Sequence, residues 1–172
     1  MRFSDVIPKD RLPYVGYIAT GAGFEPDAIS IDAVYVRFKK THPEAFAPSI
    51  SQAGDVGADV FALEDVVIPA RGHALVRTGV IIEWPRGFRG RLQSRSGLSL
   101  KFGIEVGAGL IDTSFRKELG VVLHNHSDID YTVENGMAVA NLCVERYTYP
   151  VFEEVEELSE TERTGGFGSS NR

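Results

Sequence analysis

The chain has 172 residues, of which 43% are hydrophobic and 24% charged, a composition that fits one ordinary globular domain with its own core. Its net charge of −6 argues against binding of nucleic acid through the whole surface. The sequence shows no apolar stretch of membrane-spanning length and no signal peptide, and its single cysteine, Cys143, excludes a disulfide framework and a cysteine-based metal site. We therefore expect a cytoplasmic protein without a membrane partner, in which Cys143 is a buried thiol.

Residues 1–30 mix apolar and aromatic side chains with glycine and proline, and we interpret them as a terminal extension of unknown role. From Ile31 onward, short apolar runs alternate with Gly/Pro turns at a spacing of roughly ten residues. The expected strands lie at 34–38, 66–68, 74–76, 80–82, 104–106 and 119–123. Helical periodicity is nearly absent, and one short helix fits near 96–101. The pattern predicts an all-β sandwich, barrel or jelly roll.

The stretch 107–115, between two short apolar runs, has the residues expected of a small-ligand site. Positions 107–109 are Gly-Ala-Gly, so a ligand can lie against bare backbone amides and carbonyls. Asp112 adds a carboxylate and Phe115 adds a flat ring. This combination suits a small planar polar ligand attached to a sugar. A plain β-hairpin with an aspartate in its turn fits the same residues.

Three other stretches carry groups suited to a phosphate or a cation. Residues 53–59 are Gly-rich with two carboxylates, which fits either a loop facing a hydrated cation or an ordinary loop before a strand. Arg95, Ser96 and Gly97 offer a guanidinium, a hydroxyl and an exposed amide, a set that suits phosphate oxygens. Asn141 is the one polar residue in an apolar run, so it needs a partner, either backbone or ligand.

Residues 158–172 change character, because they are first polar and then Gly-rich. They contain too few apolar side chains to add to a core, so we expect a mobile arm. Phe167 is a ring between glycines, which suits closure over a bound ring while Arg163 and Ser169 reach charged oxygens. A disordered tail is the alternative interpretation.

The order of these stretches along the chain resembles the five motifs of the homotrimeric dUTPase family (deoxyuridine 5′-triphosphate nucleotidohydrolases). The matching segments are 53–59, 95–97, 107–115, 136–141 and 163–169. The resemblance covers about residues 31–170, and it implies a β-domain at 31–157 with 158–172 as the arm that closes over an active site. It also implies a jelly roll, or distorted β-barrel, whose homotrimer places active sites between subunits. Such an enzyme cleaves dUTP to dUMP and pyrophosphate with Mg²⁺.

The resemblance assigns a role to each matching residue. Asp112 stands at the family's catalytic aspartate, which activates the water that attacks the α-phosphorus and bonds the 3′-hydroxyl. Phe115, where tyrosine is usual, packs under the deoxyribose and leaves no room for a 2′-hydroxyl. Asp59 contacts Mg²⁺ through water. The other substrate-binding residues implied are Arg95, Ser96, Gly97, Gly107, Ala108, Gly109, Leu110, Asn141, Arg163, Phe167, Gly168 and Ser169. Among these, the backbone of 107–110 reads uracil, Phe167 stacks on it, and the arginines hold phosphates.

The chain departs from the family's usual pattern at several motif positions. The replacements are Ala58 for tyrosine, Ser94 for proline, Lys117 for glycine, Met137-Ala138 for a charged pair and Asn141 for glutamine. Asn141 is one methylene shorter than glutamine, and the missing charges predict a changed network around Arg95. Arg163 also lies one residue closer to Gly-Gly-Phe than is typical. Because Asp112 is present, activity is expected.

Two other functions fit parts of this pattern. A dCTP deaminase shares the fold, but its family carries a catalytic glutamate ten residues after the matching aspartate, where this chain has Val122, and Glu118 lies in a different register. A deaminase is therefore disfavoured. The second alternative is a dUTPase-like regulatory protein of reduced activity that engages an unknown protein partner through 1–30 or another surface. Measured turnover separates this alternative from an enzyme.

Overall fold

A computed structural model describes residues 34–52 and 54–161. Within these ranges the chain forms short strands and one short helix. In chain order the elements are β1 (Arg37–Lys40), β2 (Gly57–Phe61), β3 (Val66–Ile68), β4 (His73–Arg77), β5 (Val80–Glu83), β6 (Phe88–Gln93), α2 (Ser96–Phe102), β7 (Ile104–Val106), β8 (Leu110–Ile111), β9 (Gly120–Asn125), β10 (Tyr131–Val133) and β11 (Ala138–Arg146). The predicted all-β class is confirmed, and the helix lies where it was expected.

Alternating burial explains why these segments form strands with one inner face. In β9, Val121, Leu123 and Asn125 are buried, whereas the residues between them are only half-buried. Successive strand residues point to opposite faces, so this alternation places every second side chain in the core. The polar member of the inner row, Asn125, donates from its amide to the backbone carbonyls of Ile68 (3.1 Å) and Ile129 (2.8 Å). Its burial is therefore compensated by hydrogen bonds.

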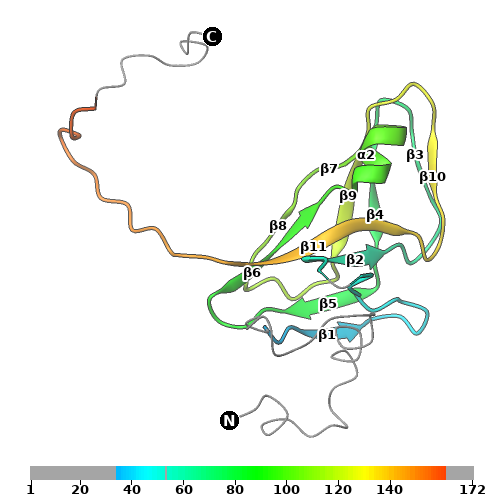
Figure 1. Cartoon of the computed structure of the whole chain (residues 1–172), viewed down its shortest axis with the longest axis horizontal. Coiled ribbons are helices and arrows are strands. Elements are labelled where there is room, and N and C mark those ends of the chain that lie inside the picture. Colours follow the sequence, from blue (N-terminus) through cyan, green and yellow to red (C-terminus); the bar gives the residue numbers. More distant parts are fainter. Residues whose placement is uncertain (1–33, 53, 162–172) are drawn as a thin grey trace, which may run out of the picture.

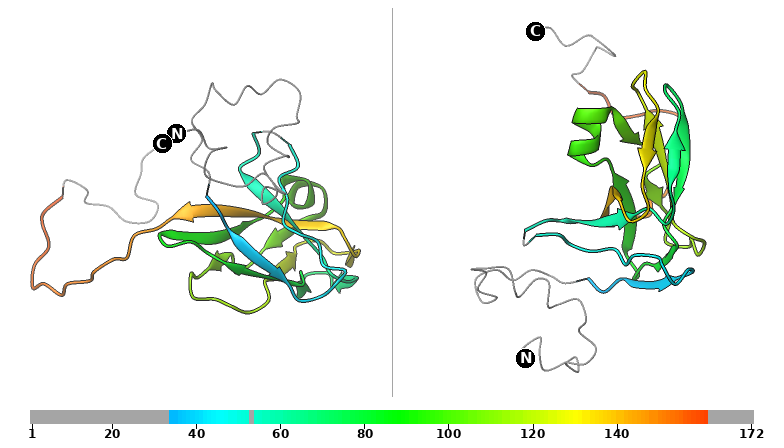
Figure 2. Two further views of the ribbon diagram at one scale, coloured as in Figure 1. Left: turned by 90° about the horizontal axis from the view of Figure 1, so that it is seen from below. Right: turned by 90° about the vertical axis from the view of Figure 1, so that its right-hand side faces the viewer.

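The strands form two larger antiparallel sheets, with the orders β2-β11-β6-β8 and β4-β9-β7. Two further pairs, β1-β5 and β10-β3, accompany them in the described ranges. Both larger sheets contribute to one hydrophobic core, for example through Leu92 and Leu142 from one sheet and Val121 from the other. Figures 1 and 2 show α2 on the opposite side of the domain from β1. No helix in the described ranges is long and apolar enough to span a membrane.

The first strand differs from its prediction, because β1 covers Arg37–Lys40 and not 34–38. Its register is decided by β5, with Arg37 opposite Glu83 and Lys40 opposite Val80. Alternation along a sequence indicates a strand, but the residues at which the strand begins and ends depend on where its partner strand pairs with it. The helix extends one residue further than expected and ends at Gly103, whose φ of 66° is left-handed. Glycine adopts this conformation without a steric cost, so it is the common stop for a helix.

After β11 the chain leaves the body of the domain. Residues 148–161 are exposed and, apart from an isolated bend, irregular, and Figures 1 and 2 show this segment extending away from the sheets. Val151, Phe152 and Leu158 are 93%, 90% and 85% exposed, so their apolar side chains find no packing within the described residues. This exposed stretch begins before residue 158, where the sequence predicts that the arm begins. The rest of that arm, 162–172, lies outside the described residues.

Candidate active site

A hollow of about 640 Å³ lies between the loop 51–57 and one side of α2. Asp59 of β2 and Asn141 of β11 line it from the sheet, and Arg95, Ser96 and Lys101 line it from the helix side. Three of the sequence motifs, which lie far apart along the chain, therefore meet around one space. Arginine, serine and asparagine can all donate hydrogen bonds to anionic oxygens, so the hollow is suited to a phosphate chain.

The sheet register explains why these motifs meet. Asn141 lies on the central strand β11, where it is opposite Asp59 of β2 on one side and Gln93 of β6 on the other. Arg95 follows Gln93 at the turn into α2, and so reaches over the same end of the sheet. At Gly57, a Cβ would lie 3.0 Å from the Cβ of Asn141. Glycine at this position therefore leaves room for the asparagine side chain.

Asp59 and Arg95 form the polar centre of the hollow. The Asp59 carboxylate accepts a hydrogen bond from the hydroxyl of Ser51 (2.6 Å) through Oδ2, and its Oδ1 lies 3.3 Å from Nε of Arg95. Asp59 is only 9% exposed, so its charge needs both partners. The aspartate in turn fixes one edge of the guanidinium group. The sequence did not single out Ser51, because a serine in a polar loop gives no distinctive signal.

Arg95 has a second anchor at the start of β11. Its Nη1 donates to the backbone carbonyl of Ala138 at 3.0 Å, and a β-bulge shifts the register of β11 between Ala138 and Ala140. This contact with the backbone needs no charged side chain at 137 or 138. The expected change in the network relative to other family members stays a prediction. Asn141 makes no side-chain hydrogen bond to another described residue and lines the hollow, which favours a ligand as its partner.

The stretch 107–109 lies between the two sheets and is shaped by close backbone contacts. The amide of Gly107 donates to the carbonyl of Val122 (2.8 Å), and the amide of Leu92 donates to the carbonyl of Gly109 (2.8 Å). A Cβ at Gly107 would lie 2.7 Å from Nε2 of His124, and one at Gly109 would lie 2.6 Å from the Leu92 carbonyl oxygen. Gly109 faces backbone and therefore requires glycine for packing, whereas a side chain at Gly107 would require His124 to move.

The alternative interpretation of this stretch, a plain β-hairpin, is only partly correct. The strands β7 and β9 do pair antiparallel, but the chain between them crosses to the other sheet, where β8 pairs with β6. This crossing places Gly90 opposite Ile111 and Arg91 opposite Leu110. Local sequence does not show it, because the partner strand lies some twenty residues earlier in the chain.

Asp112 lies at the other end of β6 from Arg95. It follows Ile111, whose partner is Gly90 near the start of β6, whereas Arg95 follows the end of β6 at Gln93. Strand residues advance about 3.3 Å each, so roughly 15–20 Å of backbone separates the positions of Asp112 and Arg95 within one chain. Asp112 and Phe115 are exposed, and no residue of 107–115 lines the hollow. The structure brings together motifs one, two and four of the resemblance, and it leaves the third apart from them.

A second set of polar contacts, which the sequence did not reveal, joins the Arg95 turn to the start of 107–115. The hydroxyl of Ser94 accepts a hydrogen bond from the amide of Val106 (2.9 Å). The serine that stands in place of the family's usual proline therefore contacts β7 directly. The hydroxyl of Ser99 donates to the carboxylate of Glu105. Hydrogen bonds from Ser94 and Ser99 lower the pKa of Glu105. Both hydroxyls therefore hold β7 against the turn that carries Arg95.

Four predicted site residues, Arg163, Phe167, Gly168 and Ser169, lie outside the described residues. Near the described end of the chain, hydrogen bonds with Tyr147 and Thr113 lower the pKa of Tyr149, which places Tyr149 beside the loop that follows Asp112. In the ranges that the structure describes, no group of three or more His, Cys, Asp or Glu side chains is arranged to hold a metal ion.

Comparison with known proteins supports the resemblance to the dUTPase family. The model of the dUTPase family matches residues 44–171. The deoxyuridine 5′-triphosphate nucleotidohydrolase of Oryza sativa subsp. japonica is 42% identical over 146 residues, which cover 84% of this chain and 85% of that protein. Among solved structures, the Staphylococcus bacteriophage 80alpha dUTPase with dUpNHpp aligns with a TM-score of 0.74 and 28% identity, over 80% of this chain and 98% of that one.

A mutant of the dUTPase from phage phi11 of S. aureus, described with a structural Mg(II) ion, aligns with a TM-score of 0.67 and 25% identity over 72% of this chain and 97% of that one. These similarities confirm the predicted jelly-roll fold. The family model covers far more than half of the chain, and the curated relative exceeds 40% identity over most of both sequences. The chain therefore belongs to the dUTPase family.

Proposed function

We propose that this protein is a dUTP diphosphatase that hydrolyses dUTP to dUMP and pyrophosphate. The observation that carries this proposal is the meeting of Arg95, Asp59 and Asn141 around one hollow, in a chain that belongs to the dUTPase family. A deaminase lacks support, because Val122 occupies the position of its catalytic glutamate.

The hollow is proposed to hold the phosphate chain. Arg95 uses Nε toward Asp59 and Nη1 toward the Ala138 carbonyl, and its Nη2 has no partner among the described residues. This nitrogen is therefore available to a phosphate oxygen, in a direction set by the two anchored nitrogens. The Ser96 hydroxyl, the Gly97 amide and the Asn141 side chain supply further donors around the same space.

The donor set fits Mg²⁺ that arrives with the substrate. Carboxylates and phosphate oxygens are the ligands this ion prefers, and it usually keeps several waters. The described residues hold no dedicated metal cage, while Asp55 and Asp59 line the hollow. Both oxygens of Asp59 already face Ser51 and Arg95, so a contact through water is the role that suits it. Bound to the triphosphate, the ion offsets negative charge on the phosphates.

Asp112 is proposed as the general base. Its carboxylate accepts a proton from a water molecule as the water oxygen forms a bond to the α-phosphorus. The bond between that phosphorus and the bridging oxygen breaks, and the electron pair leaves with pyrophosphate. The backbone of 107–110 reads uracil, and the ring of Phe115 lies under the deoxyribose and excludes a 2′-hydroxyl. Arg163, Phe167, Gly168 and Ser169 are proposed to close over the bound nucleotide.

A homotrimer with active sites between subunits is proposed because one chain separates the two halves of the site. Asp112 and Arg95 lie at opposite ends of β6 in a single protomer. Symmetric association allows the 107–115 stretch of one protomer to face the hollow of another. The exposed apolar side chains of Val151, Phe152 and Leu158 also favour a neighbouring chain as their cover.

A nucleotide panel tests the proposed function. We expect pyrophosphate release from dUTP with Mg²⁺ in strong preference to dTTP, dCTP and UTP, measured as kcat/KM. Equal turnover of UTP and dUTP would refute the role of Phe115 at the sugar. Binding of dUTP without turnover would instead favour the regulatory alternative, and release of ammonia from dCTP would indicate a deaminase.

A further inference from the structure

The loop that carries Asp112 and Phe115 joins the two-residue strand β8 to β9. Several of its hydrogen bonds are internal: the amide of Phe115 donates to the carbonyl of Asp112 (3.1 Å), and Nη1 of Arg116 donates to the carbonyls of Thr113 (2.6 Å) and Phe115 (2.9 Å). Such bonds hold the loop in its own shape. They do not decide how the loop sits on the domain. That depends on the contact of Thr113 with Tyr149 and on the attachment of the two ends of the loop.

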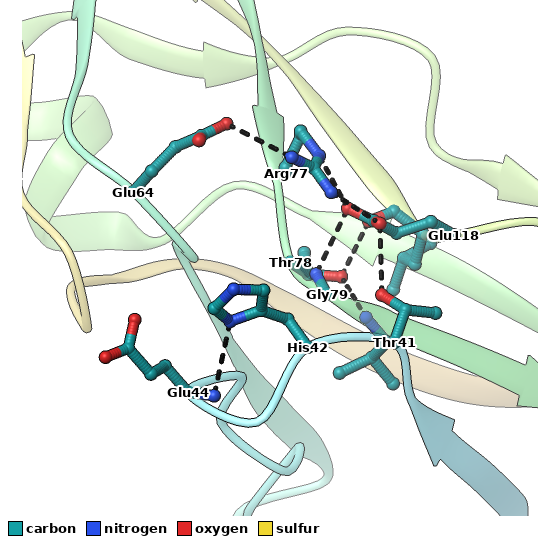
Figure 3. A network of polar contacts seen from close by, with 10 residues as sticks. Thr41, His42, Glu44, Glu64, Arg77, Thr78, Gly79 and Glu118 are labelled. Carbon is teal, nitrogen blue, oxygen red and sulfur yellow. Dashed lines mark hydrogen bonds and ion pairs between the residues drawn. The ribbon is translucent and has the colours of Figure 1, made fainter.

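The far end of the loop is held by Glu118, whose carboxylate accepts four hydrogen bonds (Figure 3). Arg77 donates two of them, from Nε to Oε1 (3.1 Å) and from Nη2 to Oε2 (3.0 Å). The amide of Gly79 donates to Oε1 (3.2 Å), and the hydroxyl of Thr41 donates to Oε2 (3.1 Å). We call Glu118, Arg77, Gly79 and Thr41 the Glu118 cluster. It joins the loop to the end of β4, the turn into β5 and the end of β1.

Backbone contacts continue this attachment beyond the cluster. The amide of Leu119 donates to the carbonyl of Val80 (2.7 Å), and the buried hydroxyl of Thr78 donates to the carbonyl of Leu119 (2.6 Å). At Gly79, φ is 67°, and a Cβ would lie 2.7 Å from that of Ala45. A side chain at this position would therefore be strained and would clash with Ala45, so glycine allows the turn to pack against the core with its amide facing Glu118.

The charges of the cluster favour a persistent contact. Hydrogen bonding from Arg77 lowers the pKa of Glu118, so this carboxylate is ionised at neutral pH. Two parallel bonds between a guanidinium and a carboxylate restrict direction as well as distance. Glu118 has a side-chain exposure of 23%, whereas Arg77 is 50% exposed and also lies 3.8 Å from Glu64. The carboxylate is therefore the fixed member of the pair and the arginine closes over it.

We propose that Glu118 is a positioning residue for catalysis, which acts through its bonds to Arg77, Gly79 and Thr41 by setting where the loop places Asp112 and Phe115. This inference rests on the proposed function, in which Asp112 is the base. Glu118 itself touches no substrate. A small displacement of a reacting group costs rate far more than it costs binding, because the attack geometry is lost while the phosphate contacts at Arg95 are unaffected.

The test is Glu118→Gln, which keeps the size of the side chain and removes the charge paired with Arg77. We expect kcat for dUTP to fall by about 10–100-fold, the scale of a misplaced catalytic group. Binding of α,β-imido-dUTP should change less than about threefold, and the preference for dUTP over UTP should narrow because Phe115 shifts with the loop. In a double-mutant cycle, adding Arg77→Met to Glu118→Gln should cost much less than Arg77→Met alone.

The matched control is Glu83→Gln, which breaks a second Arg–Glu pair, Arg37 with Glu83 at 2.6 Å, on β1 and β5. It should leave kcat unchanged. A folded Glu118→Gln variant with wild-type kcat, or an equal loss in Glu83→Gln, would overturn the positioning role. If Glu118→Gln does not fold, Thr41→Val removes one of the four hydrogen bonds to Glu118 and should also lower kcat. An unchanged kcat in that variant would overturn the proposal.

Asp112→Asn in the same assay separates the positioning role of Glu118 from the proposed role of Asp112 as the base. Retained activity in Asp112→Asn would refute the proposed base, whatever the result for Glu118→Gln.

Discussion

At the scale of single residues, Arg95 shows how one side chain serves three purposes. Two of its nitrogens are committed to protein, toward Asp59 and toward the Ala138 carbonyl, and the third is left for a ligand. A guanidinium held at two points loses little further freedom when it binds phosphate. Lysine offers one charged nitrogen on a flexible stem and could not reproduce this arrangement. The identity of Arg95 therefore matters beyond its charge.

Asp112 gives the residue-scale prediction. Asp112→Asn keeps the shape of the side chain and removes the base, so kcat for dUTP should fall by about 10²–10⁴-fold, the usual contribution of general-base catalysis. Affinity for α,β-imido-dUTP, measured by calorimetry, should stay within a few-fold of wild type. A variant with near-wild-type kcat would show that another group activates the water.

At the scale of elements, the end of β6 is the junction of the site. The amide of Leu92 donates to the carbonyl of Gly109, and the hydroxyl of Ser94 accepts from the amide of Val106. The last residues of β6 and the turn that leads to Arg95 therefore hold the start of the 107–115 stretch. Glu105 adds its carboxylate to the same junction through the hydroxyls of Ser94 and Ser99. The serine that replaces the usual proline is thus part of a polar contact between two sheets.

The Glu105 junction gives a prediction about pH. Its pKa is lowered in the folded protein, chiefly by hydrogen bonds from Ser94 and then from Ser99, with His126 adding a favourable charge and His124 as its cross-strand neighbour. A lowered folded pKa contributes stability that is present above the ordinary value of 4.5 and is lost as the pH falls through the lowered value. Glu105→Gln should therefore reduce the free energy of unfolding at pH 7, and the difference from wild type should shrink in acid.

Urea denaturation across pH 3–7 measures this difference. Glu153→Gln, on the exposed segment after β11, serves as the control, because its side chain has no described hydrogen-bond partner to lose. A Glu105→Gln penalty that stays constant over the whole range would show that shape, and not charge, stabilises the junction.

At the scale of the whole molecule, one protomer holds the two proposed halves of the site apart from each other. The hollow with Arg95 lies at one end of β6, and Asp112 lies near the other end. The proposed mechanism uses both groups in one site, and on that proposal the protomers have to associate. The β-domain is small and its last described segment extends into solvent, which suits an assembly in which neighbours complete each other's surfaces (Figures 1 and 2).

Complementation between inactive variants tests this arrangement. Asp112→Asn and Arg95→Gln should each abolish most activity alone. When the two proteins are mixed, unfolded and refolded together, about a quarter of the intersubunit sites should combine an intact Asp112 with an intact Arg95, if protomers associate at random in a closed ring. Steady-state pyrophosphate release and light scattering, read on the same sample, should show partial recovery in a trimer. Refolding each variant separately is the control, and no recovery in the mixed trimer would place both residues of each site on one chain.

The sequence by itself determined the all-β class, the position of the helix and the family, because alternating apolar residues, Gly/Pro turns and an ordered set of motifs are local properties of a chain. It also indicated Arg95, as part of an Arg-Ser-Gly set suited to phosphate oxygens. It indicated Asn141 because a polar residue in an apolar run needs a partner. The roles that it assigned to the site residues stay predictions, and Arg163, Phe167, Gly168 and Ser169 also lie outside the described residues.

Only the tertiary structure decided which groups meet. The register of β11 places Asn141 opposite Asp59, the bulge brings the Ala138 carbonyl to Arg95, and the crossing of β8 to β6 carries Asp112 away from the hollow. The start of β1 likewise followed its partner β5 and not its own alternation. Each of these outcomes depends on hydrogen bonds between segments far apart in sequence, and such bonds form only when packing of the core selects one register among several that the local pattern allows.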